Sequence, residues 1–222
     1  MSKKFEVIFL EQAIDFLNSL DLKTREKIYY NVDKAKLRLD PKLFKKLTDD
    51  IWEFRTKYNG LQYRLFAFWD RTDKSETLVI STHGIIKKVG KVPKSDIVKL
   101  KRLEKNTLIN KFMETKGKKM KMMTLDQLKD RDIGKIGTPE RDKYEFDLRM
   151  ELLGEMIKSV RKERKLTQEQ LGNLIGVQKS QISKLEHNTK NVTIETILKV
   201  FQALKANVKF SVEMNEAEFK VT

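Results

Sequence analysis

The chain has 222 residues, of which 39% are hydrophobic, and this is enough apolar material for one or two buried cores. Its formal net charge of +15 favours a polyanionic partner such as nucleic acid. The absence of cysteine excludes disulfides and thiolate metal sites, and the two histidines, His83 and His187, are too few for a histidine-built metal cluster, so no metal or other cofactor is expected.

The first 112 residues are predicted to form a small α+β domain. Asp21 is suited to open a helix, and Asn59-Gly60 is a signal for a two-residue hairpin between strands. Strands are expected at residues 5–10, 51–57, 61–69 and 76–83. Helices are expected at residues 12–20, 22–39 and 95–111. This order predicts a small antiparallel sheet with helices packed on one face.

Basic residues recur on the predicted strands of this domain. If strands 51–57, 61–69 and 76–83 lie side by side, Arg55, Arg64 and His83 converge on one face. Cleavage of RNA by its own 2′-OH needs cations to stabilise the phosphorane and a proton for the leaving 5′-oxygen. The candidate catalytic residues are Arg55, Arg64, His83, Lys87 and Lys88, and the candidate RNA-binding residues are Lys57 and Lys91.

A structural or merely solvated role is the alternative for these residues. A single histidine at a strand end is usually structural, and the lysines at 87–91 are by default a solvated loop. Tyr63 alternates with Arg64, so it is predicted to point into the core. Trp52 and Trp69 are likewise most simply core residues.

Residues 113–143 divide the chain. They hold three of its nine glycines and lack a sustained helical or strand period, so they are expected to form a tether with one short helix at 124–129. The acidic stretch 125–132 is a candidate docking piece. The second half then continues with a helix at about 140–165, which Thr138-Pro139-Glu140 would start well.

Residues 166–186 read as two short helices joined by a tight turn at Gly176. Another helix is expected at 193–205, followed by a short strand at 207–214. The side chains predicted to point inward from these helices are Leu171, Leu174, Ile175, Val177, Ile182, Leu185, Ile194, Ile197, Leu198, Phe201 and Leu204. The second half is therefore expected to be an all-α domain, over residues 144–222, with a short C-terminal strand.

Three sequence elements at 166–171, 176–177 and 182–186 resemble the Xre/Cro-type helix-turn-helix family, and the likeness extends over residues 146–205. The resemblance implies a structural ion pair between Arg161 and Glu186, and a homodimer that binds a palindrome through this half. The residues that it places at DNA are Gln168, Gln178, Lys179, Ser180, Gln181 and Lys184. Gln181 suits an adenine edge, whereas the lysines suit guanine or phosphate. A merely solvated polar helix face is the alternative.

Three fragments of the first half, at 51–55, 62–66 and 83–93, resemble RelE/HigB-type toxins of the phage-derived branch. The tether, with Thr138-Pro139-Glu140, resembles the region before the helix-turn-helix in HigA-type antitoxins. These resemblances imply that residues 1–112 are a metal-independent, ribosome-dependent mRNA endoribonuclease. Residues 113–222 would be its antitoxin, which binds the toxin half and represses transcription at operator DNA.

Two alternatives keep part of this interpretation. The related ParE toxins act on DNA gyrase and need no RNA-cleaving residues. The other alternative is a non-enzymatic transcription factor whose basic N-terminal domain, with 25 Lys and Arg against 15 Asp and Glu, is an interaction module. Residues 1–20 lack the apolar core of a signal peptide and no apolar run reaches membrane-spanning length, so a cytoplasmic protein without membrane contact is expected.

Overall fold

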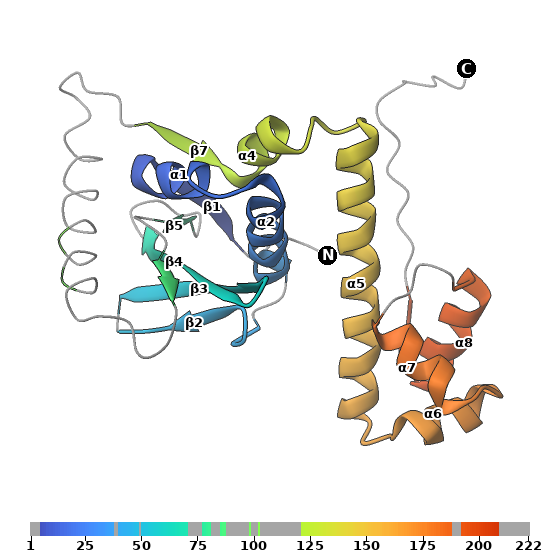
Figure 1. Ribbon diagram of the computed structural model, residues 1–222. Helices are drawn as coiled ribbons and strands as arrows, with labels where there is room; N and C mark the ends of the chain where they lie inside the picture. The colour runs from blue at the N-terminus through green and yellow to red at the C-terminus, as the bar shows by residue number, and fades with distance from the viewer. Residues whose placement is uncertain are drawn as a thin grey trace, which may run out of the picture. The chain divides into compact units, whose positions relative to one another are not determined.

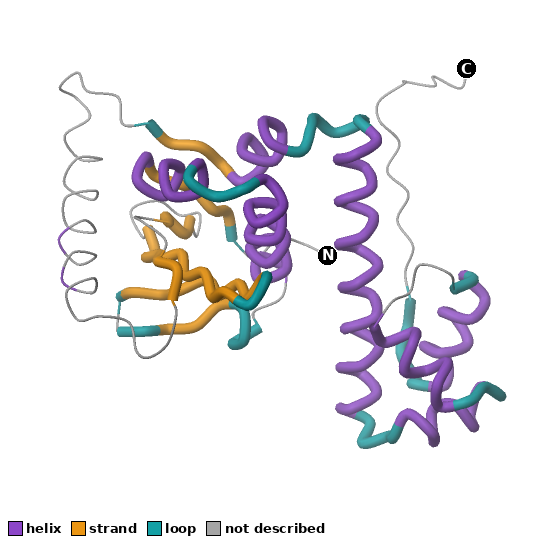
Figure 2. The backbone as a smooth tube through the Cα atoms, viewed as in Figure 1, coloured by secondary structure: helices purple, strands orange, loops and turns teal. Residues whose placement is uncertain are grey.

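The structure is a computed structural model that describes residues 5–37, 40–48, 50–70, 77–80, 85–87, 98, 102, 121–187 and 192–208. The chain divides into two compact units, Met1–Tyr144 and Glu145–Thr222. Figures 1 and 2 show a mixed α/β unit followed by a helical one. The predicted fold class, an α+β domain followed by a helix-turn-helix domain, is confirmed. The predicted helix at 95–111 lies outside the described residues except for Val98 and Arg102.

A mixed sheet organises the first unit (Figure 2). Its strands follow the order β2-β3-β4-β5-β1-β7, and β6 also pairs with β4. Strand β1 runs parallel to β5, and the other pairs are antiparallel. The strands are β1 (Glu6–Leu10), β2 (Phe44–Lys46), β3 (Ile51–Tyr58), β4 (Leu61–Asp70), β5 (Thr77–Ile80), β6 (Ile85–Lys87) and β7 (Met122–Thr124).

The hairpin between β3 and β4 forms where the sequence predicts it. Asn59 and Gly60 both have positive φ, 47° and 74°, which is the backbone of a type I′ turn. Tyr58 consequently pairs with Leu61, and the register continues to Ile51 opposite Phe68. This register fixes which side chains of the two strands share a face.

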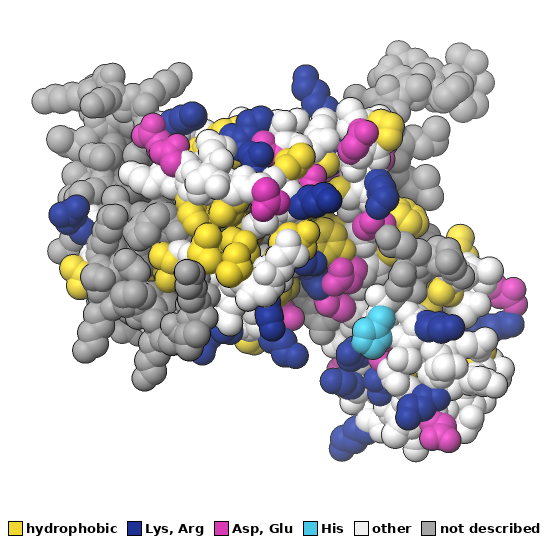
Figure 3. Space-filling model, in the orientation of Figure 1, with side chains coloured by type: hydrophobic (Ala, Val, Ile, Leu, Met, Phe, Trp, Pro, Cys, Tyr) yellow, Lys and Arg dark blue, Asp and Glu magenta, His cyan; other side chains and the backbone are white. Residues whose placement is uncertain are grey.

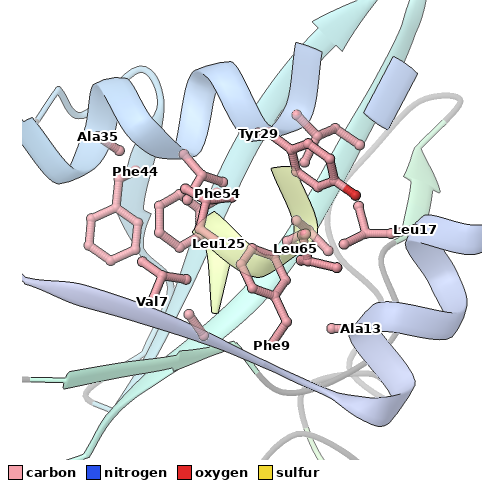
Figure 4. Packing of buried hydrophobic residues seen from close by; sticks show 14 of the residues in the cluster. Val7, Phe9, Ala13, Leu17, Tyr29, Ala35, Phe44, Phe54, Leu65 and Leu125 are labelled. Carbon is pink, nitrogen blue, oxygen red and sulfur yellow. The ribbon is translucent and has the colours of Figure 1, made fainter. Parts of the chain in front are cut away.

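Helices α1 (Glu11–Asn18) and α2 (Leu22–Leu37) pack on one face of the sheet. Asp21 caps α2, because its carboxylate accepts hydrogen bonds from the backbone N–H and the hydroxyl of Thr24. These bonds hold the pKa of Asp21 below its usual value. Figure 4 shows the core beneath the helices, where Phe9 of β1, Phe54 of β3 and Leu65 of β4 meet side chains from α1 and α2.

The segment predicted as a tether contributes structure to this first unit. The predicted helix at 124–129 is confirmed as α4 (Leu125–Asp132), which starts with a reciprocal capping box between Thr124 and Gln127. Just before it, β7 pairs with β1. In Figure 1 both elements are drawn in yellow-green, and α4 lies beside α2. By its contacts, this part of the tether therefore belongs to the N-terminal unit.

Helix α5 (Pro139–Glu163) begins in the first unit and continues into the second, where α6 (Gln168–Ile175), α7 (Lys179–His187) and α8 (Ile194–Ala203) follow. Thr167 and Gln170 form a second capping box at the start of α6. Gly176 ends α6 in the left-handed conformation, with φ of 74°. Of the predicted strand at 207–214, only Asn207 and Val208 are described, and neither is in a strand.

Three side chains that were predicted to point inward are exposed instead. The exposed fraction is 60% for Leu174, 65% for Ile194 and 42% for Leu198. The inward stripe of α8 runs through Ile197, Val200, Phe201 and Leu204, and at 100° per residue it leaves Ile194 and Leu198 on its flank. On α6, Leu171 and Ile175 face the core, and Leu174 lies beside this row. The prediction for these three residues was wrong because it assigned a wider apolar face to α6 and α8 than the helices bury.

No helix among the described residues is both long and apolar enough to cross a membrane.

Candidate functional site

Two arginines stand directly opposite each other on the sheet. Arg55 of β3 pairs with Arg64 of β4 in the antiparallel register. Their neighbours Phe54 and Leu65 point into the core beneath the helices, so the arginines lie on the other face of the sheet. We refer to Arg55 and Arg64 as the arginine pair. The register therefore places these two residues on one face of the sheet, as the sequence predicts.

Glu53 offsets the repulsion between these two like charges. It precedes Arg55 by two residues on β3 and therefore shares its face. Its Oε1 lies 3.3 Å from Nε of Arg55, and its Oε2 lies 3.4 Å from Nε of Arg64. These contacts are ion pairs without hydrogen-bond geometry, since Glu53 Oε2 and Arg55 Nε make no hydrogen bond within the described part of the chain. Glu53 is buried and was not among the predicted site residues.

Arg64 is the more enclosed of the pair. Only 4% of it is exposed, and its guanidinium donates to the carbonyl of Tyr63 at 3.1 Å and to Oε1 of Gln62 at 2.7 Å. Burial lowers the pKa of Arg64, Glu53 acts in the opposite direction, and an arginine stays cationic in either case. The side chain of Arg55 is 35% exposed. Arg55 is thus the member of the pair that a polyanion reaches more easily.

Three lysines stand at register positions near the arginine pair. Lys57 is exposed and pairs with Gln62, two register positions along the hairpin from the arginines. Lys87 of β6 pairs with Gln62 from the other side of β4. Lys45 of β2 pairs with Glu53 and is exposed, which the sequence prediction did not anticipate. The predicted residues His83, Lys88 and Lys91 lie outside the described residues.

The aromatic residues predicted as core are confirmed in that role. Tyr63 is 4% exposed and belongs to the main hydrophobic cluster. Trp52 and Trp69 are partly buried against the same cluster. Trp52 stacks on the ring of Phe44 of β2, and Trp69 meets that ring edge-to-face.

Among the described residues, no group of three or more His, Asp or Glu side chains is arranged to hold a metal ion.

The second unit contains the predicted ion pair in a buried network. Arg161 donates from Nε and Nη2 to the carboxylate of Glu186, and Nη1 donates to the carbonyl of Leu166 at 2.6 Å. The amide of Gln168 donates to Oε2 of Glu186 at 2.8 Å. Burial acts to raise the pKa of Glu186, but these hydrogen bonds outweigh it and hold the pKa below its ordinary value. Gln168, which was predicted to contact DNA, here supports the end of α7.

Close approach of backbones accompanies this network. A Cβ on Gly154 of α5 would lie 2.9 Å from the carbonyl oxygens of Leu185 and Glu186. A Cβ on Gly172 of α6 would lie 2.5 Å from the carbonyl oxygen of Val177. Gly154 therefore allows α5 to approach the end of α7 closely, and Gly172 allows the turn after α6 to fold back against that helix.

Helix α7 separates its buried and exposed sides cleanly. Ile182 and Leu185 are buried in the core of the unit. Figure 3 shows Lys and Arg side chains gathered on the visible face of this unit. The predicted DNA-contacting residues at the start of α7 and along it are all exposed, namely Gln178, Lys179, Ser180, Gln181 and Lys184. This second surface, which we call the α7 surface, suits a polyanion better than an apolar partner.

Two family models match separate parts of the chain. Residues 15–105 match the family described as "Phage derived protein Gp49-like", and this matched stretch contains the arginine pair. Residues 157–209 match the family described as "Helix-turn-helix", which spans the α7 surface. The chain joins a Gp49-like domain to a helix-turn-helix domain. No curated protein matches this chain significantly.

These two family matches confirm the recognition of an Xre-type helix-turn-helix and of a phage-derived partner domain. One similar solved structure is a complex of a HipB variant with an O2 20mer. That match has 30% identity and a TM-score of 0.27, and it covers 29% of this chain and 89% of the other.

Proposed function

We propose that this chain is a toxin and its antitoxin in one polypeptide. Residues 1–112 form a ribosome-dependent mRNA endoribonuclease of the RelE/HigB type, and residues 113–222 form an antitoxin of the HigA type that neutralises it and represses its own promoter. The combination of a Gp49-like domain with a helix-turn-helix domain supports this proposal. Its main support is the arginine pair, because opposed guanidinium groups on a sheet face suit the binding of a phosphodiester.

The proposed reaction is transesterification within the RNA. The 2′-oxygen attacks the adjacent phosphorus, the bond to the 5′-oxygen breaks, and a 2′,3′-cyclic phosphate forms. The proton of the 2′-OH passes to a base, and the departing 5′-oxygen receives a proton. Arg55 and Arg64 would stabilise the charge of the phosphorane, which explains how the reaction proceeds without a metal. The proton-transfer roles are assigned to His83, Lys87 and Lys88, and Lys57 and Lys91 would bind the flanking RNA.

In the proposed repressor, the helix-turn-helix domain places α7 in the major groove of operator DNA. Gln181 would read an adenine edge, while Lys179 and Lys184 would contact guanine or phosphate. Gln178 and Ser180 lie at the same exposed end of α7 and would contact the backbone. A homodimer formed through this half would present two such helices to a palindrome.

The deciding experiment induces residues 1–112 in cells, with and without residues 113–222 supplied separately, and maps the 5′ ends of mRNAs. New cleavage within translated regions that the second half suppresses is the expected result. Growth arrest with intact mRNA would favour a ParE-like action on gyrase. A soluble, folded first half that causes no arrest would favour a non-enzymatic regulator.

Substitutions in the arginine pair make this experiment specific. Arg64→Lys keeps the charge beside Glu53 but removes the planar fork that binds phosphate oxygens, so cleavage should fall at least tenfold. Lys23→Ala, at an exposed position on α2 away from the pair, serves as the matched control and should retain full toxicity. Equal toxicity of both variants would contradict the proposed nuclease site.

A further inference from the structure

The described residues after the Gp49-like match continue its sheet. Strand β7 runs antiparallel to β1, with Ile8 opposite Thr124 and Leu10 opposite Met122. The other side of β1 is already paired with β5, so β7 occupies the remaining edge of β1. Addition of a strand to an open edge is a common way for an extended segment to bind a partner domain.

The helix that follows β7 completes the hydrophobic core. Leu125 and Leu128 of α4 are 1% and 0% exposed, and they belong to the same cluster as the core residues of β1, β3 and α2. Figure 4 shows Leu125 between Phe54 and Phe9. Removal of α4 would expose this core to water. The hydrophobic effect therefore disfavours separation of α4 from the rest of the unit.

Buried polar contacts connect the same segment to α2. Nζ of Lys129 lies 2.8 Å from Oδ2 of Asp33, and the hydroxyl of Tyr144 donates to the same oxygen at 2.9 Å. The hydroxyl of Tyr29 donates to Asp132 at 2.6 Å. Arg25 forms an ion pair with Asp132 at 3.1 Å. Each contact joins a residue of α2 to one of 129–144, so the two surfaces are complementary in charge.

The segment is also organised by contacts of its own. Arg141, at the start of α5, is 1% exposed and donates to Asp130 at 2.7 Å and to Asp126 at 3.2 Å. These bonds hold the start of α5 against α4. A segment that is ordered internally loses less conformational entropy when it binds.

We propose that residues 121–144, the docking segment, are a recognition element that binds the Gp49-like domain without needing a covalent connection to it. The inference rests on the proposed function, in which the docking segment is the part of the antitoxin that holds the toxin. It binds away from the arginine pair, because β7 lies three strands from β4 in the sheet and α4 covers the opposite face. Binding of the docking segment to the domain therefore does not depend on occupying the proposed nuclease site.

The test uses the full chain with a protease recognition sequence inserted between Lys116 and Gly117, outside both family matches. After complete cleavage, the two fragments should elute together in size-exclusion chromatography at micromolar concentration. Leu128→Asp should make the cleaved fragments separate, because it places a charge in the core. Lys135→Ala, at an exposed position of the same segment, should leave them together.

A second variant, which removes one polar contact of the docking segment, keeps the proposal testable if Leu128→Asp fails to fold. In uncleaved Lys129→Ala, hydrogen exchange should rise at least tenfold in α4 and β7 but not in α6 or α7. After cleavage, this variant should bind at least tenfold more weakly than the wild type. Separation of the wild-type fragments on cleavage, or equal behaviour of Leu128→Asp and Lys135→Ala, would overturn the proposal.

Fragment elution and mRNA cleavage together distinguish a failure of the docking proposal from a failure of the proposed nuclease. Arg64→Lys leaves every contact of the docking segment in place, so its fragments should elute together even if RNA cleavage is abolished. Fragments that separate while residues 1–112 still cleave mRNA would overturn the docking proposal alone. Fragments that remain together without any RNA cleavage in cells would overturn the nuclease and leave the docking segment standing.

Discussion

Lys129 of α4 and Asp33 of α2 form a buried ion pair between residues 96 positions apart in the chain, with 2.8 Å between Nζ and Oδ2. Burial raises the pKa of Asp33, while Lys129, the charge of Lys36 and the hydrogen bond from Tyr144 act to lower it. Lys129 is the largest of these opposing influences on the carboxylate. A lysine that the sequence places in a tether thus serves as the counter-ion of a helix in the preceding domain.

Lys129→Ala should destabilise the Gp49-like unit by about 3–5 kcal/mol, since removal of one partner leaves an uncompensated buried charge. Urea denaturation of the full chain would measure this loss. Adding Asp33→Asn to this variant should recover a large part of it, because the amide carries no charge. The exposed Lys135→Ala is the control, with an expected change within about 0.5 kcal/mol. A loss of that small size for Lys129→Ala would contradict the structural role of the pair.

The pH dependence of this variant has a definite sign. The pKa of Asp33 in the folded state lies above its ordinary value of 3.8, and loss of Lys129 raises it further. A carboxyl group with a raised pKa favours the folded state at low pH, and this contribution is lost as pH rises through the folded pKa. Lys129→Ala should therefore differ least from the wild type near pH 4 and most at neutral pH.

Gly154→Ala should destabilise the helix-turn-helix unit by about 1–3 kcal/mol, although glycine to alanine within a helix usually gains up to about 1 kcal/mol. The new Cβ would press on the carbonyl oxygens of Leu185 and Glu186, which are backbone atoms that cannot rotate away. Thermal unfolding followed by circular dichroism would measure the change. Lys162→Ala, at an exposed position of the same helix, should be neutral. A stabilised Gly154→Ala would contradict the close approach of the α5 and α7 backbones.

The local elements were predictable because their determinants are contiguous. Thr167, Gln170 and Gly176 specify where α6 starts and ends, and Asn59-Gly60 specifies a type I′ hairpin that fixes Arg55 opposite Arg64. Once that register is known, alternation also places Glu53 beside both arginines. Glu53 was not predicted, because RNA cleavage without a metal directs attention to cationic side chains. The available signal was an acidic residue two positions before Arg55 on the same strand.

The remaining elements depend on pairing that no short pattern specifies. Strands β2, β6 and β7 have three residues each, too few for alternation to be recognised. Strand β7 is specified by its partner β1, which lies more than a hundred residues earlier in the chain. For the same reason, Leu125 and Leu128 read as an isolated apolar pair in a polar tether. The core that buries them is formed by β1, β3 and α2.

The helix-turn-helix unit should lose stability in acid through Glu186. Its pKa in the folded state lies below the ordinary value of 4.5, so its contribution is present above pH 4.5 and is lost as pH falls through the folded value. Unfolding of the full chain, monitored by hydrogen exchange in α6 and α7 between pH 7 and pH 3, would show the loss. Glu186→Gln should be less stable at pH 7 and should lack most of this pH dependence. An unchanged acid response in that variant would assign the dependence to other carboxylates.

The α7 surface leads to a prediction that distinguishes sequence reading from phosphate contact. Gln181→Ala should weaken binding to a selected operator by about 1–3 kcal/mol and relax the base preference at one position, since the amide would read a base edge. Lys184→Ala should weaken binding to all sequences alike and reduce the salt slope by about one, because it would release one phosphate contact. Titrations by fluorescence anisotropy at several salt concentrations would measure both effects. Lys199→Ala is the control, because Lys199 lies on α8, where it pairs with Glu195. If Gln181→Ala changed the salt slope and left base preference intact, the proposed orientation of α7 in the groove would be wrong.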